Sequence, residues 1–329
     1  MSNFVRHEIN VEDFINSLQK DGEGHIVLNM FVNFLLLLDW VQLNLFDNSI
    51  LHDSFLESAQ RCSAPGHESK PEEVRFVQKQ HPWKGITYFT DKAIHLAPQV
   101  NSTLKVAWLI EPGDLLPGLH NNIKSLEDSF DFVLTYEENL LDHNPEKYKF
   151  FPCDTSGIEK SSHKMHKKSK LVSMVYSEKK WLTGHKLRHI IVESLLPKVG
   201  YDKVDLFGRG TPNPLDLKSE GTNDYMFQIA IENMKRPNYF ADKIYDCFAT
   251  ATVPIYWGAP NVGDFFDPRG ILTFNNPQEL SNILFSLSEE KYNSMLPYVK
   301  KNFELVKKYL RPDDYIFEET VRYLREKHK

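Results

Sequence analysis

Cysteine is scarce in this 329-residue sequence, and positive charge is not in excess. The three cysteines, Cys62, Cys153 and Cys247, lie far apart and are odd in number. This argues against a disulfide framework or a zinc site and favours free buried thiols. The formal net charge is -6, whereas a nucleic-acid partner needs a basic face that neutralises phosphates. We therefore expect no nucleic-acid partner.

Long hydrophobic runs are also lacking. The most apolar stretch, residues 26–46, is interrupted by asparagines and by Asp39. A membrane helix needs about 20 nearly uninterrupted apolar residues, and an aspartate within the span is costly. We therefore interpret the segment Phe34–Leu38 as core. The polar residues 1–8 lack the layout of a signal peptide, so we expect a cytoplasmic protein with at most peripheral membrane contact.

Two polar stretches divide the chain, whose length suits two α/β domains. Residues 61–73 have the Pro, Gly and Ser content of a loop. Residues 154–170 are basic, lack apolar periodicity and have the composition of an interdomain linker. His163, His166 and the neighbouring lysines could form a metal or phosphate patch, but a solvated linker face is the interpretation we favour.

Strand-like and helix-like segments alternate along the rest of the chain. The strand-like segments are Gly85–Thr90, Leu104–Ile110, Phe130–Leu134, Lys170–Tyr176, Val204–Phe207, Tyr225–Ile231 and Val253–Trp257. The helix-like segments are Thr183–Leu196, Ala241–Ala251, Pro277–Ser286 and parts of the polar tail Glu289–Lys329. Such alternation predicts parallel sheets with helices on both faces and ligands at the carboxyl ends of the strands.

One constellation of polar residues follows a buried strand. The strand runs into Glu232 and Asn233, and Tyr239 to Lys243 are expected to open a helix. The unpaired N–H groups of a helix start and the ammonium of Lys243 suit a phosphate, while Glu232 and Asp242 can accept hydrogen bonds from sugar hydroxyls. On the residues alone, an ordinary first-turn Asp242 and a solvated Lys243 are an equally good interpretation.

This segment resembles the donor-binding signature of the α-1,3/1,4-fucosyltransferase family. In that family a strand ends in Glu-Asn, followed by Tyr-x-x-Glu-Lys and then by Gly-Thr-(Val/Ile)-Pro-Ile-Tyr-Trp-Gly. The matching segments here are Glu232-Asn233, Tyr239–Lys243 and Ala251–Gly258. Asp242 replaces the family's glutamate and is one methylene shorter, which leaves the choice of sugar donor open.

The resemblance extends over about residues 85 to 275. Arg188 fits the place of a helical arginine in the family, and Val204–Gly208 fits a Val-Asp-x-x-Gly stretch. In the amino-terminal domain the family has a strand ending in Gly-Glu-Asn, which supplies the catalytic base. Here the strand ends in Glu111 and Pro112, so the match is weaker at this point.

The resemblance implies the GT-B fold, in which two Rossmann-like domains face each other across a cleft. Residues 1–160 would form the acceptor-binding domain, 161–310 the donor-binding domain, and 311–329 a carboxy-terminal helix that packs back on the first domain. The implied reaction is an inverting transfer of L-fucose from GDP-β-L-fucose to a hydroxyl of a glycan acceptor, with an α-1,3-type linkage.

The resemblance also implies roles for individual residues. Glu111 would be the catalytic base, with Glu137 and Glu138 as substitutes. Arg188 and Lys243 would neutralise the departing diphosphate in place of a catalytic metal, so no metal or cofactor is expected. The remaining residues implied to bind the sugar donor are Glu232, Asn233, Tyr239 and Asp242.

Less specific interpretations remain for these residues. Glu111 could be an ordinary loop carboxylate and Arg188 a surface helix residue, while Tyr239 could serve packing alone. For the whole chain, the alternatives are a transferase for another nucleotide-activated sugar, such as a GDP-hexose or dTDP-sugar, and an inactive glycan-binding or nucleotide-binding relative.

Overall fold

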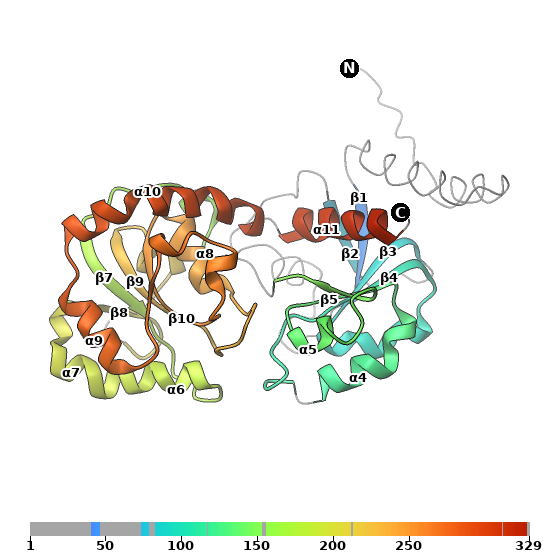
Figure 1. The fold of residues 1–329 in the computed structure, drawn as a ribbon, viewed down its shortest axis with the longest axis horizontal. Coiled ribbons are helices and arrows are strands. Elements are labelled where there is room, and N and C mark those ends of the chain that lie inside the picture. The colour runs from blue at the N-terminus through green and yellow to red at the C-terminus, as the bar shows by residue number, and fades with distance from the viewer. Residues whose placement is uncertain are drawn as a thin grey trace, which may run out of the picture.

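The structure, a computed structural model, describes residues 41–46, 74–78, 83–116, 118–152, 156–211, 213–310 and 312–327. It contains two β-sheets that lie side by side, each with its own helices (Figure 1). All recorded strand pairs are parallel, as the alternation of segments predicted. The predicted core segment Phe34–Leu38 and the predicted loop at 61–73 lie outside the described residues.

The first sheet has six strands in the order β2-β1-β3-β4-β5-β6. Its strands are β1 Val41–Phe46, β2 Val74–Gln78, β3 Trp83–Thr90, β4 Ser102–Trp108, β5 Phe132–Thr135 and β6 Tyr148–Phe150. The connections carry a 3-10 helix at Asp91–Gln99, α4 at Leu119–Leu126 and α5 at Glu138–Leu141. The sequence interpretation contained neither β1 nor β2.

The second sheet has five strands in the order β11-β10-β9-β7-β8. Its strands are β7 Lys170–Val175, β8 Asp205–Phe207, β9 Tyr225–Ile231, β10 Val253–Trp257 and β11 Leu272–Thr273. The helices are α6 Thr183–Ile190, which continues through a π-helical turn at Ile191–Leu195 into α7 Leu196–Val199, then α8 Asp242–Ala249, α9 Pro277–Phe285 and α10 Glu289–Val306. A short 3-10 turn, η6, spans Lys218–Gly221.

The central strand β9 explains why this sheet has a sharply defined carboxyl edge. All seven residues of β9 are buried, as expected for a parallel strand covered by helices on both faces. The apolar run ends at Ile231, and the next residue is Glu232. The change from apolar to charged residues therefore places polar groups at the end of the sheet where ligands bind in such folds.

The last helix returns to the first sheet. Helix α11, Pro312–Lys327, follows α10 and contacts β2, and its Ile316 belongs to the core of the first sheet. Tyr315 of α11 stacks on Phe151 with ring centroids 4.9 Å apart and meets Tyr309 edge-on at 5.5 Å. The chain thus passes between the halves twice, once after β6 and once before α11, and aromatic contacts join the two passages.

The expectation of a solvated linker at 154–170 holds for only part of the described segment: several of its lysines are exposed, but Ile158 and Lys168 pack into the second half. Ile158 is 1% exposed and belongs to a core cluster of the second half. Lys168 Nζ donates to three carbonyl oxygens and to a threonine hydroxyl, at 2.7 to 3.1 Å. Burial lowers the pKa of both His163 and His166. Composition alone did not predict this burial, because it depends on a few polar groups of the segment that form hydrogen bonds with the second half.

The prediction of free buried thiols can be tested at one of the three cysteines. Cys247 is a free, buried thiol, as predicted, and its Sγ lies 3.2 Å from Oε1 of Gln228 as a donor. Burial raises its pKa well above the usual value, so the thiol stays protonated. Cys62 and Cys153 lie outside the described residues.

Candidate functional site

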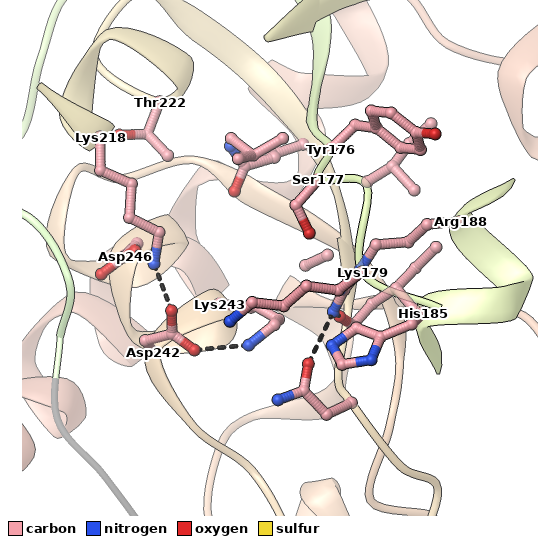
Figure 2. Close-up of a pocket in the computed structure, with 16 residues that line it drawn as sticks. Tyr176, Ser177, Lys179, His185, Arg188, Lys218, Thr222, Asp242, Lys243 and Asp246 are labelled. Carbon is pink, nitrogen blue, oxygen red and sulfur yellow. Dashed lines mark hydrogen bonds and ion pairs between the residues drawn. The ribbon is translucent and has the colours of Figure 1, made fainter. Parts of the chain in front are cut away.

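A cavity of about 280 Å³ opens at the carboxyl edge of the second sheet. Its walls come from the ends of β7 and β9, the first turns of α6 and α8, and η6 (Figure 2). Four of the predicted site residues line it, namely Arg188, Asn233, Asp242 and Lys243. Residues separated by 55 positions in the sequence therefore meet in one pocket, as the fucosyltransferase resemblance implied for a binding site of the sugar donor.

Arg188 reaches the cavity because α6 docks tightly on the end of β9. Gly184 N–H donates to the carbonyl of Asn233 at 2.9 Å, and a Cβ at Gly184 would lie 1.8 Å from the carbonyl oxygen of Glu232. Only glycine allows this approach. One turn later, Arg188 Nη2 donates to the Ile231 carbonyl and, at 3.2 Å, to Asn233 Oδ1. Arg188 is 7% exposed, so it is not a surface helix arginine.

Glu232 lies beneath the cavity and holds the start of α8. Its side chain is fully buried, and Oε1 accepts the N–H of Ala241 at 3.0 Å. Its Oε2 lies 3.6 Å from Lys243 Nζ. Gly258 makes room for this carboxylate, since a Cβ there would lie 2.5 Å from Glu232 Cγ. Glu232 therefore acts on the helix start and on Lys243, and it does not itself line the cavity.

Asp242 is shared by two lysines. Lys243 Nζ donates to Asp242 Oδ1 at 2.6 Å, and Lys218 Nζ donates to Asp242 Oδ2 (Figure 2). Lys218 also lies 2.5 Å from Asp246 Oδ2, one turn further along α8. Both lysines are thus held in an alternating row of charges, and Lys243 is not the solvated side chain that the less specific interpretation described.

The charges shift the pKa values of these groups in opposite directions. Burial acts to raise the pKa of Asp242, but Lys218 and Lys243 outweigh it and hold the pKa well below the usual range. Burial raises the pKa of Glu232 and of Asp246, against the opposing effect of the nearby lysines. Asp242 is therefore the carboxylate of this site that is most firmly ionised.

The pKa of the cavity-lining His185 is lowered to about 4, chiefly by burial and further by the charge of Arg188. Its Nδ1 accepts the N–H of Leu182 at 3.2 Å. The imidazole is therefore neutral near pH 7, with its proton on Nε2.

The structure places Tyr239 away from the cavity. Helix α8 begins at Asp242, so Tyr239 lies in the turn before it and does not open the helix as predicted. Tyr239 is 3% exposed and packs against Tyr136 from the end of β5, with ring centroids 5.1 Å apart. Leu182 and Met234 complete this cluster. Packing at the junction of the two halves is therefore its observed role, and its contact with a sugar donor stays a prediction.

The carboxyl edges of the two sheets meet at this junction. Arg236, from the turn after β9, lies 2.8 Å from Asp114 Oδ1 and 2.8 Å from Glu137 Oε1, which follow β4 and β5 respectively. The Asn238 side-chain amide donates to the Tyr136 carbonyl at 3.3 Å. Ligand-binding edges of both sheets are thereby brought to the same side of the molecule.

Glu111 lies at the carboxyl end of β4, on the first sheet, and does not line the cavity of the second half. Asp91 Oδ1 accepts the backbone N–H groups of Ile110 at 2.8 Å and of Glu111 at 3.2 Å. Asp91 itself has φ of 38°, in the left-handed region that costs a non-glycine residue energy. A strained residue thus fixes the backbone of Glu111, whose side chain is half-buried.

The two substitute bases differ in their surroundings. Glu137 is 9% exposed, and its carboxylate is paired with Arg236. Glu138 begins α5 and is exposed. A general base needs a carboxylate that is accessible to the acceptor hydroxyl and not held by a permanent cation. Glu111 meets this requirement better than Glu137.

Among the lining residues that sequence reasoning missed are His185, Lys218 and Asp246. The alternation of Asp242 and Asp246 along one helix face was a usable signal, because residues four apart project from the same side. Lys218 lies in a 3-10 turn with no recognisable motif, so only the fold brings it to the site.

Two kinds of feature are absent from the described residues. No group of three or more His, Cys, Asp or Glu side chains in the described part of the chain is arranged to hold a metal ion. Within the same residues, no helix combines the length and apolar character needed to cross a bilayer.

Comparison with protein families gives a match over the second half of the chain. Residues 165–324 match "Glycosyltransferase family 10 (fucosyltransferase) C-term". The matched segment contains the cavity and every residue described above as lining it.

Curated relatives match over shorter segments. The chain is 33% identical over 75 residues to an α-(1,3)-fucosyltransferase of Helicobacter pylori, which is 23% of this chain and 15% of that protein. It is 30% identical over 140 residues to the 3-galactosyl-N-acetylglucosaminide 4-α-L-fucosyltransferase of Bos taurus, which is 40% of this chain and 36% of that protein. The matched segments thus span well under two thirds of these relatives.

Solved structures show the same fold over most of the chain. The structure is similar to that of an α1,3-fucosyltransferase with GDP-fucose, with a TM-score of 0.51 and 16% identity, over 86% of this chain and 90% of the other. The same enzyme type with GDP gives a TM-score of 0.51 and 15% identity, over 85% and 89%. The expected GT-B arrangement of two Rossmann-like domains is therefore confirmed.

Proposed function

We propose that this chain, whose residues 165–324 match glycosyltransferase family 10, is an inverting fucosyltransferase of that family. It transfers L-fucose from GDP-β-L-fucose to a hydroxyl of a glycan acceptor and forms an α-1,3-type linkage. The named relatives and the GDP-fucose complex of the similar structure support this choice of sugar.

The observation that carries the proposal is the meeting of Arg188, Lys243 and Asp242 in one cavity at the carboxyl edge of the second sheet. A diphosphate leaving group gains negative charge as the glycosidic bond breaks, and fixed cations in a partly buried site stabilise that charge strongly. Arg188 and Lys243 supply such charge, so the reaction needs no metal ion for this purpose. Asp242, which is firmly ionised, can accept hydrogen bonds from sugar hydroxyls.

We assign the proton transfer to Glu111. Inversion in a single displacement requires a base beside the acceptor hydroxyl, on the face of the sugar opposite the leaving diphosphate. Glu111 follows strand β4 of the first sheet, and its backbone is fixed by Asp91. The oxygen of the acceptor attacks the anomeric carbon, its proton passes to Glu111, and GDP departs toward the cations.

The division of the chain follows the same proposal. Residues 1–160 bind the acceptor, residues 161–310 bind GDP-fucose, and the carboxy-terminal segment 311–329 packs on the acceptor-binding half. The cytoplasmic location and the absence of a nucleic-acid partner stay predictions.

A donor screen tests the function directly. The protein is incubated with GDP-fucose, GDP-mannose or dTDP-glucose, with and without oligosaccharides ending in galactose-N-acetylglucosamine, and the products are followed by mass spectrometry. We expect release or transfer of fucose only, and proton NMR of the product should show an α-fucoside. Turnover of another nucleotide sugar alone would favour the alternative transferase, and GDP binding without any turnover would favour the inactive relative.

A further inference from the structure

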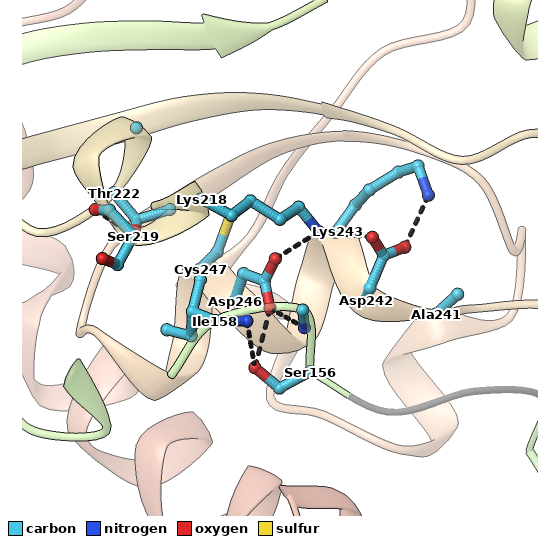
Figure 3. A network of polar contacts seen from close by, with 12 residues as sticks. Ser156, Ile158, Lys218, Ser219, Thr222, Ala241, Asp242, Lys243, Asp246 and Cys247 are labelled. Atoms are coloured by element: carbon cyan, nitrogen blue, oxygen red, sulfur yellow. Dashed lines mark hydrogen bonds and ion pairs between the residues drawn. The ribbon is translucent and has the colours of Figure 1, made fainter. Parts of the chain in front are cut away.

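Lys218 is a cation of the cavity that the fucosyltransferase signature does not contain. It lies on η6, before β9, and its ammonium sits between the carboxylates of Asp242 and Asp246 (Figure 3). Its side chain is 29% exposed and lines the cavity, so it remains accessible to a ligand.

The formal charges of the site favour a role for this lysine. Arg188, Lys179 and Lys243 contribute three positive charges at the cavity, whereas the carboxyl groups at and beneath it, Glu232, Asp242 and Asp246, contribute up to three negative charges. Without Lys218 these formal charges cancel, and a diphosphate would meet no net positive charge. Lys218 adds a positive charge, and the raised pKa values of the buried Glu232 and Asp246 move the balance further toward positive charge.

The position of Lys218 is fixed by Asp246 and by the residues that contact Asp246. Asp246 Oδ1 accepts from Ser156 Oγ and from the N–H of Gly157, each at 2.7 Å, which leaves Oδ2 facing Lys218 (Figure 3). A Cβ at Gly157 would lie 2.5 Å from Lys218 Nζ, so this glycine covers the ammonium closely. The first described residues of the segment interpreted as a linker therefore form the wall that orients the lysine.

The hydrogen-bonding capacity of Lys218 fits a ligand contact. An ammonium has three N–H donors, and among the described residues Asp242 and Asp246 take two of them. Asp242 is also bound by Lys243, so the two ammoniums flank one carboxylate on the cavity wall. Two ammonium groups on either side of one carboxylate can contact different phosphoryl oxygens of one diphosphate.

We propose that Lys218 is a further cation that binds the diphosphate of the nucleotide sugar, together with Arg188 and Lys243. Asp242 and Asp246 hold its ammonium at the cavity wall. This inference rests on the proposed function, because it takes the ligand to be a GDP-sugar.

The test compares GDP with guanosine, which lacks the phosphates. Isothermal titration calorimetry measures both affinities for the wild type, Lys218→Met and Lys218→Arg, with thermal melting as a check on folding. We expect Lys218→Met to weaken GDP binding by at least about tenfold, the range of one charge-assisted hydrogen bond, with guanosine affinity changed less than about twofold. Lys218→Arg should recover part of the GDP affinity.

Lys168→Met is the matched control. Lys168 is also a largely buried lysine of the second half, and its Nζ donates to four oxygens without lining the cavity. Its loss should lower thermal stability and leave the ratio of GDP to guanosine affinity unchanged. If Lys218→Met lowers both affinities equally, or neither, the phosphate contact is refuted.

A second variant keeps the test valid if Lys218→Met fails to fold because it leaves the buried Asp246 without its cation. Lys218→Met combined with Asp246→Asn removes both charges of the pair, and the amide oxygen that replaces the carboxylate can still accept from the N–H of Gly157. This double variant should again lose GDP affinity selectively, and unchanged GDP affinity would refute the proposal. Failure of the wild type to bind GDP would instead refute the proposed function, which separates the two failures.

Discussion

The carboxyl edges of the two sheets differ in how firmly their predicted site residues are held in place. On the second sheet, Arg188, Asp242 and Lys243 are fixed by side-chain hydrogen bonds and ion pairs around one cavity. On the first sheet, the recorded contacts of Glu111 within the described residues run through its backbone N–H to Asp91, and its side chain is half-buried.

This difference corresponds to the two tasks of the proposed transfer reaction. A leaving group that is the same in every turnover can be met by a preorganised set of charges, which costs no reorganisation during the reaction. A base that serves a variable acceptor needs a fixed backbone and a side chain that can adjust. Substitutions on the two edges should therefore affect nucleotide binding and transfer separately.

We expect Glu111→Gln to show the largest difference between the effect on transfer and the effect on nucleotide binding. The amide cannot take the proton, so the rate of transfer should fall by about 10²- to 10⁴-fold, whereas the GDP affinity stays within about twofold. Transfer is measured with GDP-fucose and acceptor, and GDP affinity by calorimetry. Glu146→Gln, which alters an exposed carboxylate of the same half before β6, is the control and should transfer normally. A collapse of GDP binding in the Glu111 variant would contradict the assignment.

Lys243→Met should affect both quantities. The variant removes one cation from the departing diphosphate, so kcat is expected to fall by about 10²- to 10³-fold, with weaker GDP binding. Steady-state kinetics and calorimetry measure the two effects. Lys186→Met removes an exposed lysine of α6 outside the cavity and should leave both unchanged. A normal kcat in the Lys243 variant would contradict the claim that this lysine stabilises the departing diphosphate.

Arg236→Met tests the contact between the edges. The variant loses the half-exposed pair with Asp114, which contributes about 0–1 kcal/mol, and removes the cation paired with the buried Glu137. We expect a loss of a few degrees or less in Tm, a larger radius of gyration in small-angle scattering, and a KM increase for acceptor with little change for GDP-fucose. Lys235→Met, at the neighbouring position, is the control. An unchanged acceptor KM would argue against a role of this contact in acceptor binding.

The smallest effect concerns pH and His185. Its pKa in the folded protein is about 4, below the ordinary 6.5, so the unfolded chain binds a proton first as the pH falls. This group therefore supports the fold fully above pH 6.5, and that support is lost as the pH falls from 6.5 toward 4. The Tm of the wild type should drop more between about pH 7.5 and about pH 5 than that of His185→Gln. Parallel decreases would contradict the shifted pKa.

The order of elements around the cavity could be predicted because it depends on local patterns. The continuous apolar run of β9 and its abrupt end at Glu232 are visible in the sequence, and so is the polar turn before α8. The strands β1 and β2 were not predicted, since the family resemblance begins near residue 85 and gave no guide to them.

The remaining features depend on contacts between distant segments. Lys218 and Asp246 meet only because η6 and α8 fold against one strand, and residues 156–158 cover them. Tyr239 looked like a ligand-binding residue from its place in a motif, but its partner Tyr136 comes from the other sheet. Such pairings have no local signal, since each residue alone is compatible with several surroundings.

The aromatic junction of Phe151, Tyr309 and Tyr315 has a mechanical consequence. The two segments that connect the halves lie next to each other at these rings. A rotation of one half against the other about these three rings would widen the gap most at the points farthest from them. Substrates would then enter and leave on the side of the molecule away from that pivot.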